Sequence, residues 1–150
     1  MSLKLENMET DSLPLIQTIN FRLDNLPGSD ANYIYLDPTL FTTTRINPFL
    51  GDERISDIDF RFQPHSIITG KYKIPPHFKV DAMPEPEMIT MPDRSILFKR
   101  VVAEENGYIV VKYNLEFGRS YFKKVEYPEI REFFRKMFDI LHEQIALRKT

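Results

Sequence analysis

The sequence predicts a mainly β domain: an antiparallel, β-sandwich-like fold with one C-terminal amphipathic α-helix. Apolar and polar residues alternate over residues 13–23, 66–74 and 108–117, and a period of two is typical of half-buried strands. Asn106-Gly107 separates the last run from an apolar run at 95–103. Asn-Gly favours a type I′ hairpin, since both central residues need a positive φ. After residue 128 the apolar period becomes helical.

A single β-sandwich-like domain is expected over residues 13–150, because 150 residues with 42% hydrophobic content can form one core. Residues 1–12 are polar and are expected to be a disordered leader. Residues 39–64 are expected to form a long ordered loop with a short strand at 55–60. Prolines punctuate residues 75–92, so strands there should be short or lie at sheet edges.

The C-terminal helix is expected over about residues 128–146. Pro128 suits the first helical turn, where its missing N–H costs nothing. Arg148 and Lys149 would then lie near the negative end of the helix dipole. We expect the apolar stripe to pack against the sheet, with room for a neighbouring domain. The stripe comprises Ile130, Phe133, Phe134, Met137, Phe138, Leu141 and Ile145.

Composition argues against several classes of function. The chain has no Cys, so disulfides, thiolate metal sites and cysteine nucleophiles are absent. A formal net charge of -2 does not favour nucleic-acid binding. No stretch reaches the roughly 20 apolar residues of a membrane span, so membrane insertion is not expected. Residues 1–11 lack an apolar signal-peptide region, as expected of a fragment without its signal.

No catalytic residue or cofactor site is expected. The three histidines, His65, His77 and His142, lie outside any G-x-S-x-G context. We expect His142 at the border of the packed face of the helix. An enzyme would require two or three of Asp52, Asp57, Asp59 and His65 to converge in a cleft.

A metal site is not expected either. Asp52, Glu53, Asp57 and Asp59 offer oxygen ligands of the kind that Ca²⁺ prefers. The chain lacks the spacing of an EF-hand loop, and Arg54 and Arg61 lie close enough in sequence to neutralise these carboxylates. Salt bridges and turn capping are therefore the favoured interpretation.

Two surface interpretations remain. Exposed aromatic side chains would suit a glycan, although aromatic residues in loops more often plug the open ends of a sandwich. Basic residues would form a solvated outer face that discourages edge-to-edge pairing. The aromatic set is Tyr33, Tyr35, Phe41, Phe49, Phe60 and Phe62. The basic set is Lys71, Lys73, Lys79, Lys99, Arg100, Lys112, Lys123 and Lys124.

An ordered set of short motifs runs over roughly residues 30–150. They are Tyr35-Leu36-Asp37-Pro38, Asn47-Pro48-Phe49, Glu53-Arg54, Ile58-Asp59-Phe60, Ile74-Pro75 with Val80 and Pro84, Glu126-Tyr127-Pro128, Ile130-Arg131 with Phe133-Phe134, and Ile145-Ala146-Leu147-Arg148-Lys149. In order and spacing they resemble the C-terminal domain of unknown function of bacterial, periplasmic transglutaminase-like proteins.

The resemblance implies a non-catalytic accessory or interaction domain of a larger extracytoplasmic, transglutaminase-like (cysteine protease-like) protein. Its partner would be the upstream transglutaminase-like domain of the same chain, and the Cys, His and Asp of catalysis would belong to that domain. The expected location is periplasmic or extracytoplasmic. The alternative is a β-sandwich module that binds glycan or peptidoglycan, and a protein partner is also open.

Overall fold

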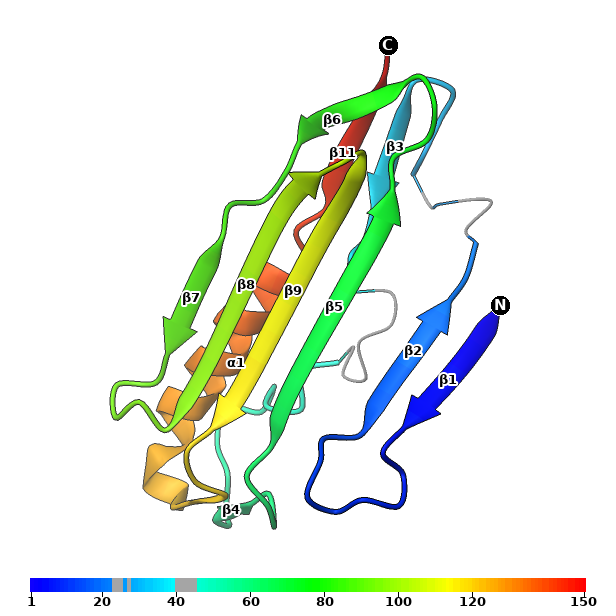
Figure 1. The fold of residues 1–150 in the computed structure, drawn as a ribbon. Helices are drawn as coiled ribbons and strands as arrows, with labels where there is room; N and C mark the ends of the chain where they lie inside the picture. Colours follow the sequence, from blue (N-terminus) through cyan, green and yellow to red (C-terminus); the bar gives the residue numbers. More distant parts are fainter. Residues whose placement is uncertain (23–25, 27, 40–45) are drawn as a thin grey trace.

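The computed structural model describes residues 1–22, 26, 28–39 and 46–150 (Figure 1). It confirms the predicted class: antiparallel sheets and one C-terminal helix. The elements, in chain order, are β1 (Ser2–Glu6), β2 (Ile16–Asn20), β3 (Tyr33–Leu36), β4 (Ile58–Asp59), β5 (His65–Lys73), β6 (Phe78–Ala82), β7 (Glu87–Thr90), β8 (Ile96–Glu105), β9 (Tyr108–Phe117), β10 (Tyr121–Phe122), a 3₁₀ turn (Lys124–Glu126), α1 (Tyr127–Leu141) and β11 (Ile145–Lys149).

A four-stranded antiparallel sheet with the order β5-β9-β8-β7 forms one layer. Strands β8 and β9 are joined by the predicted hairpin, in which Asn106 has a φ of 51° and Gly107 a φ of 77°. Both values lie in the left-handed region, as a type I′ turn requires. Glu105 pairs with Tyr108 across this turn, and the register continues to Ile96 opposite Phe117.

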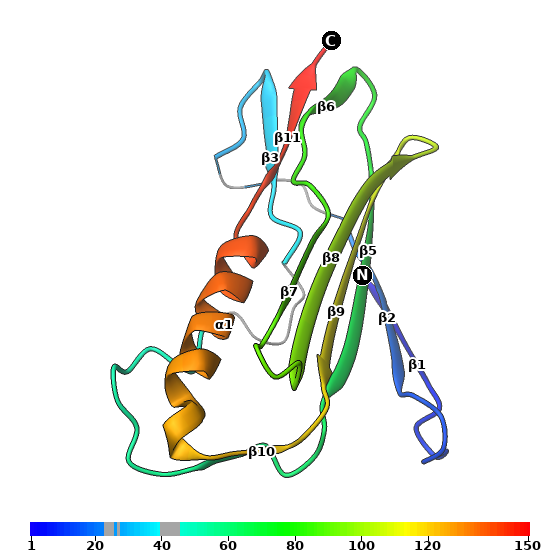
Figure 2. The same cartoon turned by 90° about the vertical axis from the view of Figure 1, so that its left-hand side faces the viewer.

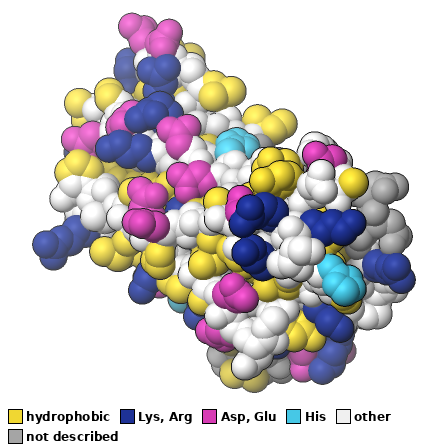
Figure 3. Space-filling model, turned by 90° about the horizontal axis from the view of Figure 1, so that it is seen from above, with side chains coloured by type: hydrophobic (Ala, Val, Ile, Leu, Met, Phe, Trp, Pro, Cys, Tyr) yellow, Lys and Arg dark blue, Asp and Glu magenta, His cyan; other side chains and the backbone are white. Residues whose placement is uncertain are grey.

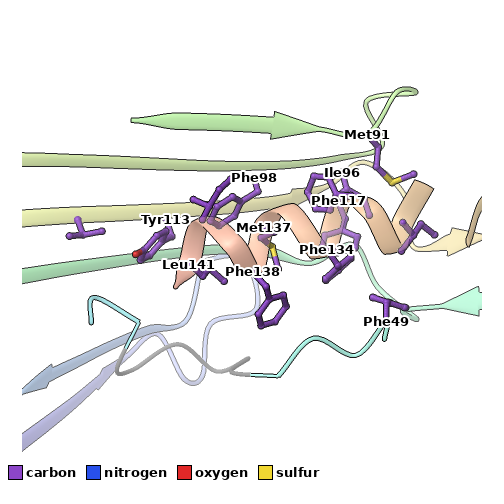
Figure 4. Close-up of a cluster of buried hydrophobic side chains, with 14 of the residues drawn as sticks. Phe49, Met91, Ile96, Phe98, Tyr113, Phe117, Phe134, Met137, Phe138 and Leu141 are labelled. Carbon is purple, nitrogen blue, oxygen red and sulfur yellow. The ribbon is translucent and has the colours of Figure 1, made fainter. Parts of the chain in front are cut away.

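Helix α1 covers one face of this sheet, and a three-stranded sheet with the order β3-β11-β6 continues that layer beyond the helix (Figures 1 and 2). The core lies between the two layers (Figure 4). Burying one such apolar side chain contributes roughly 1.5–3 kcal/mol. Buried residues of the sheet include Ile96, Phe98, Ile109 and Val111, and those of the helix include Ile130, Phe133, Phe134, Met137 and Phe138.

The helix ends earlier than predicted. It stops at Leu141, and the amide of His142 closes it by donating to Phe138 O at 3.1 Å. Ile145, predicted as the last residue of the helical stripe, instead opens β11. There Ile145 and Leu147 are buried with the period of two that a strand requires. The prediction was wrong because Ile145 fits both periods, and pairing of β11 with β3 and β6 decides between them.

The leader is also more ordered than predicted. Residues 2–6 form β1, which pairs antiparallel with β2 from Ser2↔Asn20 to Glu6↔Ile16. Leu3 and Leu5 alternate with Lys4 and Glu6, and this short pattern gains a partner only when β2 lies beside it. The expected strand at 13–23 is shorter, spanning 16–20, and its last expected residue, 23, lies outside the described residues.

The proline-rich segment and the described part of the irregular segment agree with the predictions; residues 40–45 of the loop expected at 39–64 lie outside the described residues. The short strand expected at 55–60 is β4, which pairs with β10. Strands β6 and β7, which lie in the proline-punctuated region, are both at the edge of their sheets. An edge strand needs only one side of its main chain for pairing, so nearby prolines do little harm there. None of the helices in the described part is long and apolar enough to span a membrane.

Arg100 on β8 ties the two layers together. It belonged to the predicted solvated basic face, but its side chain is only 2% exposed. It shares the inward parity of Phe98 and Val102, so it points at the helix rather than at solvent. Its Nη1 donates to Ile140 O at 2.6 Å, and a cation at that carbonyl end favourably opposes the helix dipole.

The same guanidinium also holds the chain that connects β6 and β7. Its Nη2 donates to Glu85 O at 2.8 Å and lies 2.8 Å from the Glu143 carboxylate. Glu87 lies farther away, at 3.7 Å. One side chain therefore joins the helix end, the segment before β7 and the four-stranded sheet.

A second arginine fastens the other end of the helix. Arg119 binds Asp93 at 2.7 Å and Glu126 at 2.5 Å, and lies 4.0 Å above the Phe122 ring. Burial alone would raise the pKa of Asp93, but hydrogen bonds from Ser95 and Arg119 outweigh it and lower the pKa to about 2. The β7–β8 turn, the end of β9 and the start of the helical segment are thus joined by charge-assisted hydrogen bonds.

Replacing Arg100→Ala should lower the free energy of unfolding by about 3–5 kcal/mol, because two hydrogen bonds from a buried charged group are lost and two carbonyls lose their donor. Urea unfolding followed by circular dichroism measures the change. Lys99→Ala is the matched control: Lys99 is exposed on the other face of β8, and its loss should change stability by no more than about 0.5 kcal/mol. Equal effects of the two variants would contradict the role given to Arg100.

Candidate functional site

A cavity of about 700 Å³ lies where the end of β5 approaches the three-stranded sheet and the chain that follows β2. Its size is within the range of ligand pockets, about 300–1,000 Å³. Figure 3 views this end of the molecule and shows Lys and Arg interspersed with Asp and Glu, with apolar patches between them. The apolar lining comprises Ile19, Phe21, Leu26, Ile34, Leu36, Tyr72, Pro75, Phe78, Ile109 and Leu147, and the polar lining Asn20, Arg22, Ser29, Asp30, Lys71 and Lys73.

The apolar walls of the cavity come from the core. Ile109 is fully buried, and Leu36 and Leu147 are each 4% exposed. Leu36 and Leu147 lie on neighbouring strands, and both project to the inner side of the three-stranded sheet. The walls are therefore part of the folded scaffold, which favours a preformed site.

Tyr72 on β5 is fixed in position beside the cavity. Its hydroxyl donates to Pro38 O at 3.1 Å, across to the chain that follows β3. Burial, helped by the negative charge of Asp37, raises the pKa of Tyr72 to about 12. The phenol is thus neutral at ordinary pH and acts as a hydrogen-bond donor rather than as a base.

The polar residues before β3 have structural tasks. Asp30 Oδ1 accepts hydrogen bonds from the amides of Asn32 and Tyr33, each at 2.7 Å, and these bonds lower the pKa of Asp30. Ser29 Oγ accepts from the amide of Tyr35 at 3.1 Å. These groups hold the turn that leads into β3, and so they fix one rim of the cavity.

The acidic residues considered for metal binding have different bonding partners, although Asp57 and Asp59 both lie beside Tyr121. Asp52 pairs with Arg131 at 2.7 Å, and Asp59 Oδ1 caps a turn by accepting from the amide of Arg61 at 2.7 Å. Within the described ranges, no three His, Asp or Glu side chains group as metal ligands. Glu53 does not join the other acids, and the cation that neutralises Asp52 is distant in sequence, not the predicted Arg54.

Asp57 has a structural role instead. Its carboxylate accepts hydrogen bonds from the Tyr121 hydroxyl and, at 2.6 Å, from the amide of Lys124. The Tyr121 bond is the main cause of a lowered Asp57 pKa. Asp57 thus links the loop before β4 to the start of the helical segment, through long-range hydrogen bonds rather than the predicted turn capping or salt bridge.

The three histidines lie in three different places. His65 Nε2 is 3.2 Å from Asn114 Oδ1 on the outer face of the sheet. His77 occupies the turn between β5 and β6 with a φ of 66°, and its carbonyl accepts from the amide of Thr150 at 2.8 Å. His142 caps α1 rather than lying within it. Among the four residues that an enzyme would require, Asp57 and Asp59 share a neighbour, Tyr121, whereas His65 and Asp52 bond to other partners.

The candidate aromatic residues divide between core and surface. Phe49 packs against Phe134 with ring centroids 4.5 Å apart, and Phe60 packs against Phe117 at 4.9 Å. These contacts agree with loop aromatics that close the end of the fold. Phe62, in contrast, is 68% exposed. Tyr33 and Tyr35 stack at 6.2 Å on β3, and Phe41 lies outside the described residues.

The outer face of the four-stranded sheet carries part of the predicted basic set. Lys71 and Lys73 share it with Lys99 and Lys112. Lys71 Nζ lies 4.4 Å from the centroid of the Tyr108 ring, which is on the same face. Arg100 does not belong to it. Lys79 lies on β6, and Lys123 and Lys124 lie before α1, so the full set is not one surface.

The cavity was not predicted from the sequence. Its lining comes from six strands and two connections that are distant along the chain. The only signal in the sequence was the alternation of Lys71, Tyr72 and Lys73, which gives the side-chain directions at the end of β5 but not what lies opposite.

Comparison with known proteins gives a family and one structure. The family model DUF3858, described as a domain of unknown function with a solved structure, matches residues 32–147. A crystal structure from Parabacteroides distasonis, described as that of a "putative protease", superposes with a TM-score of 0.64 at 11% sequence identity. The match covers 80% of this chain but 24% of that one, and it shows a shared fold. No curated protein matches the sequence.

Tyr72→Phe should lower the free energy of unfolding by about 0.5–1.5 kcal/mol at neutral pH, through loss of the hydrogen bond to Pro38. Because the pKa is 10.0 ordinarily and about 12 in the folded protein, the contribution of the buried phenol is complete below pH 10 and is lost as the pH rises toward 12. The stability difference between the wild type and the variant should therefore shrink over that window. Denaturant unfolding at several alkaline pH values measures it; a constant difference would contradict the burial of Tyr72.

Proposed function

Because this chain belongs to the DUF3858 family, whose members have no assigned function, we propose that it is a non-catalytic accessory domain of a larger extracytoplasmic protein. In that protein it would pack against an upstream transglutaminase-like, cysteine protease-like domain. The observation that carries the proposal is an apolar surface on the β1–β2 hairpin that nothing in the described residues covers.

The hairpin has one mainly apolar face. Leu3 and Ile19 are cross-strand partners, and Leu5 lies opposite Gln17, so these side chains share a face. Leu15 has the same parity in the chain that enters β2. Ile19 lines the cavity, but Leu3, Leu5 and Leu15 are 55%, 42% and 64% exposed. Lys4, Glu6 and Thr18 lie on the opposite face, together with Ile16, which is 44% exposed.

A surface of this kind calls for a partner. The hairpin forms its own two-stranded sheet, and a two-stranded sheet by itself is at best marginally stable in water. Exposed apolar side chains that gather on one face are also typical of a surface that contacts another molecule. A neighbouring domain that covers Leu3, Leu5 and Leu15 would solve both problems.

A domain of the same protein is the occupant that we favour. The similar fold in the Parabacteroides chain accounts for 24% of that chain, which is consistent with a module within a multidomain protein. The ordered motifs described above have the same implication and suggest the transglutaminase-like domain as neighbour and the periplasm as location. The carboxylates of Asp52, Asp57 and Asp93 are engaged in hydrogen bonds and ion pairs that hold the fold, which supports chemistry performed elsewhere.

The test uses the full-length protein. Hydrogen exchange should be slower in residues 2–6 and 16–20 of the full-length protein than in the 150-residue chain, since a docked domain protects the hairpin. Leu5→Glu with Leu15→Glu should return that exchange to the rate of the isolated chain. Equal exchange in the full-length protein and the isolated chain would contradict docking through the hairpin.

Lys4→Glu provides the matched control because it introduces the same carboxylate on the opposite face of β1. It should leave the protection intact. A parallel assay of the 150-residue chain for peptide hydrolysis and acyl transfer should show no turnover; turnover that one point substitution abolishes would overturn the non-catalytic assignment.

A further inference from the structure

The outer edge of β5 forms one wall of the cavity. The order β5-β9-β8-β7 places β5 at the end of its sheet, and no strand in the described part of the chain pairs with its outer side. Lys71, Tyr72 and Lys73 all line the cavity, although their side chains alternate between faces. The amide of Ile74 bonds to Gly107 O on the β9 side, so the main-chain groups of Tyr72 also face β9 and those of Lys71 and Lys73 face outward. This wall therefore offers the backbone N–H and C=O groups of Lys71 and Lys73.

We propose that this edge binds an extended peptide, which adds to β5 as a further strand. Its apolar side chains enter the cavity, and acidic side chains at alternate positions face Lys71 and Lys73. Strand addition of this kind takes affinity from main-chain hydrogen bonds and specificity from alternate side chains.

The cavity side selects apolar residues. An added strand would place residues opposite Gly70 and Tyr72 on the side of the core, where Ile34, Phe78 and Leu147 also line the cavity. Successive residues on one face of a strand are about 6.6–6.8 Å apart. A space of about 700 Å³ can therefore receive more than one of them.

The outer side selects acidic residues. Lys71 and Lys73 lie on the same face of β5, two residues apart. Directly opposed unlike charges on neighbouring strands stabilise a pair, and like charges destabilise it. Lysine on an edge therefore disfavours pairing with a basic strand, and it disfavours pairing of β5 with β5 of a second copy. An alternating apolar and acidic peptide meets both sides of the edge.

The first experiment measures fluorescence anisotropy of a fluorescein-labelled nonapeptide that alternates Glu and Val, titrated with the 150-residue chain. Saturable binding is expected. Lys71→Glu with Lys73→Glu should weaken it roughly tenfold or more, and should allow binding of the charge-inverted peptide that alternates Lys and Val. Both lysines are exposed, and circular dichroism confirms that the variant folds.

Lys99→Glu is the matched control. Lys99 lies on the same face but on β8, two strands from the edge, and its reversal should change affinity by no more than about twofold. Equal weakening by Lys99→Glu and by the β5 variant would reduce the effect to general electrostatics and overturn the site.

A second arm tests the main-chain contact. Two versions of the Glu-Val peptide carry N-methyl groups, one on the amides of the Glu residues and one on those of the Val residues. In each version one edge of the peptide cannot donate hydrogen bonds, so one of the two versions should lose binding. The other version should still bind, because its methyl groups lie on the edge that faces away from β5. Binding of both methylated versions would overturn strand addition. So would failure of the unmethylated peptide to bind, or binding that does not slow hydrogen exchange at residues 71–73.

Discussion

The position of a single guanidinium decides how the two layers of this domain meet. Arg100 leaves the four-stranded sheet, ends at the carbonyl groups that close α1, and reaches the carbonyl of Glu85 in the chain before β7. A buried charge is costly unless hydrogen-bonded and paired, and Glu143 supplies the opposite charge at 2.8 Å. Shifting the helix along the sheet would break the bond from Arg100 to Ile140 O, so this contact opposes a change in the register of the helix on the sheet.

The helix ends directly after this contact, and the chain continues as a strand. With the last turn of α1 held by Arg100, the chain beyond His142 crosses into the three-stranded sheet as the central strand β11. Leu147 then becomes both a core residue and a wall of the cavity. The cavity thus exists because the second layer changes from a helix to a small sheet before it reaches the end of β5.

This arrangement also leaves two surfaces that no other described element covers. The hairpin of β1 and β2 exposes leucines, and the outer edge of β5 has main-chain groups that no described strand pairs with. The first suits a flat contact with another domain, and the second suits an extended chain. They differ in their chemistry, because apolar burial drives one and main-chain hydrogen bonding drives the other.

The sequence by itself determined the features that depend on near neighbours in the chain. Alternation along 108–117 and the Asn106-Gly107 turn sufficed for the β8–β9 hairpin, and the i, i+3, i+4 spacing from Ile130 sufficed for the helix. Both are local because side-chain direction repeats with a fixed period in each type of element. Tertiary structure decided what the local pattern left open. Ile145 fits a helix and a strand equally, Leu3 and Leu5 are too few to define a strand without β2, and Arg100 looks like any surface cation. The cavity could not be predicted from local patterns, because its walls come from segments whose contacts exist only after the sheets have assembled.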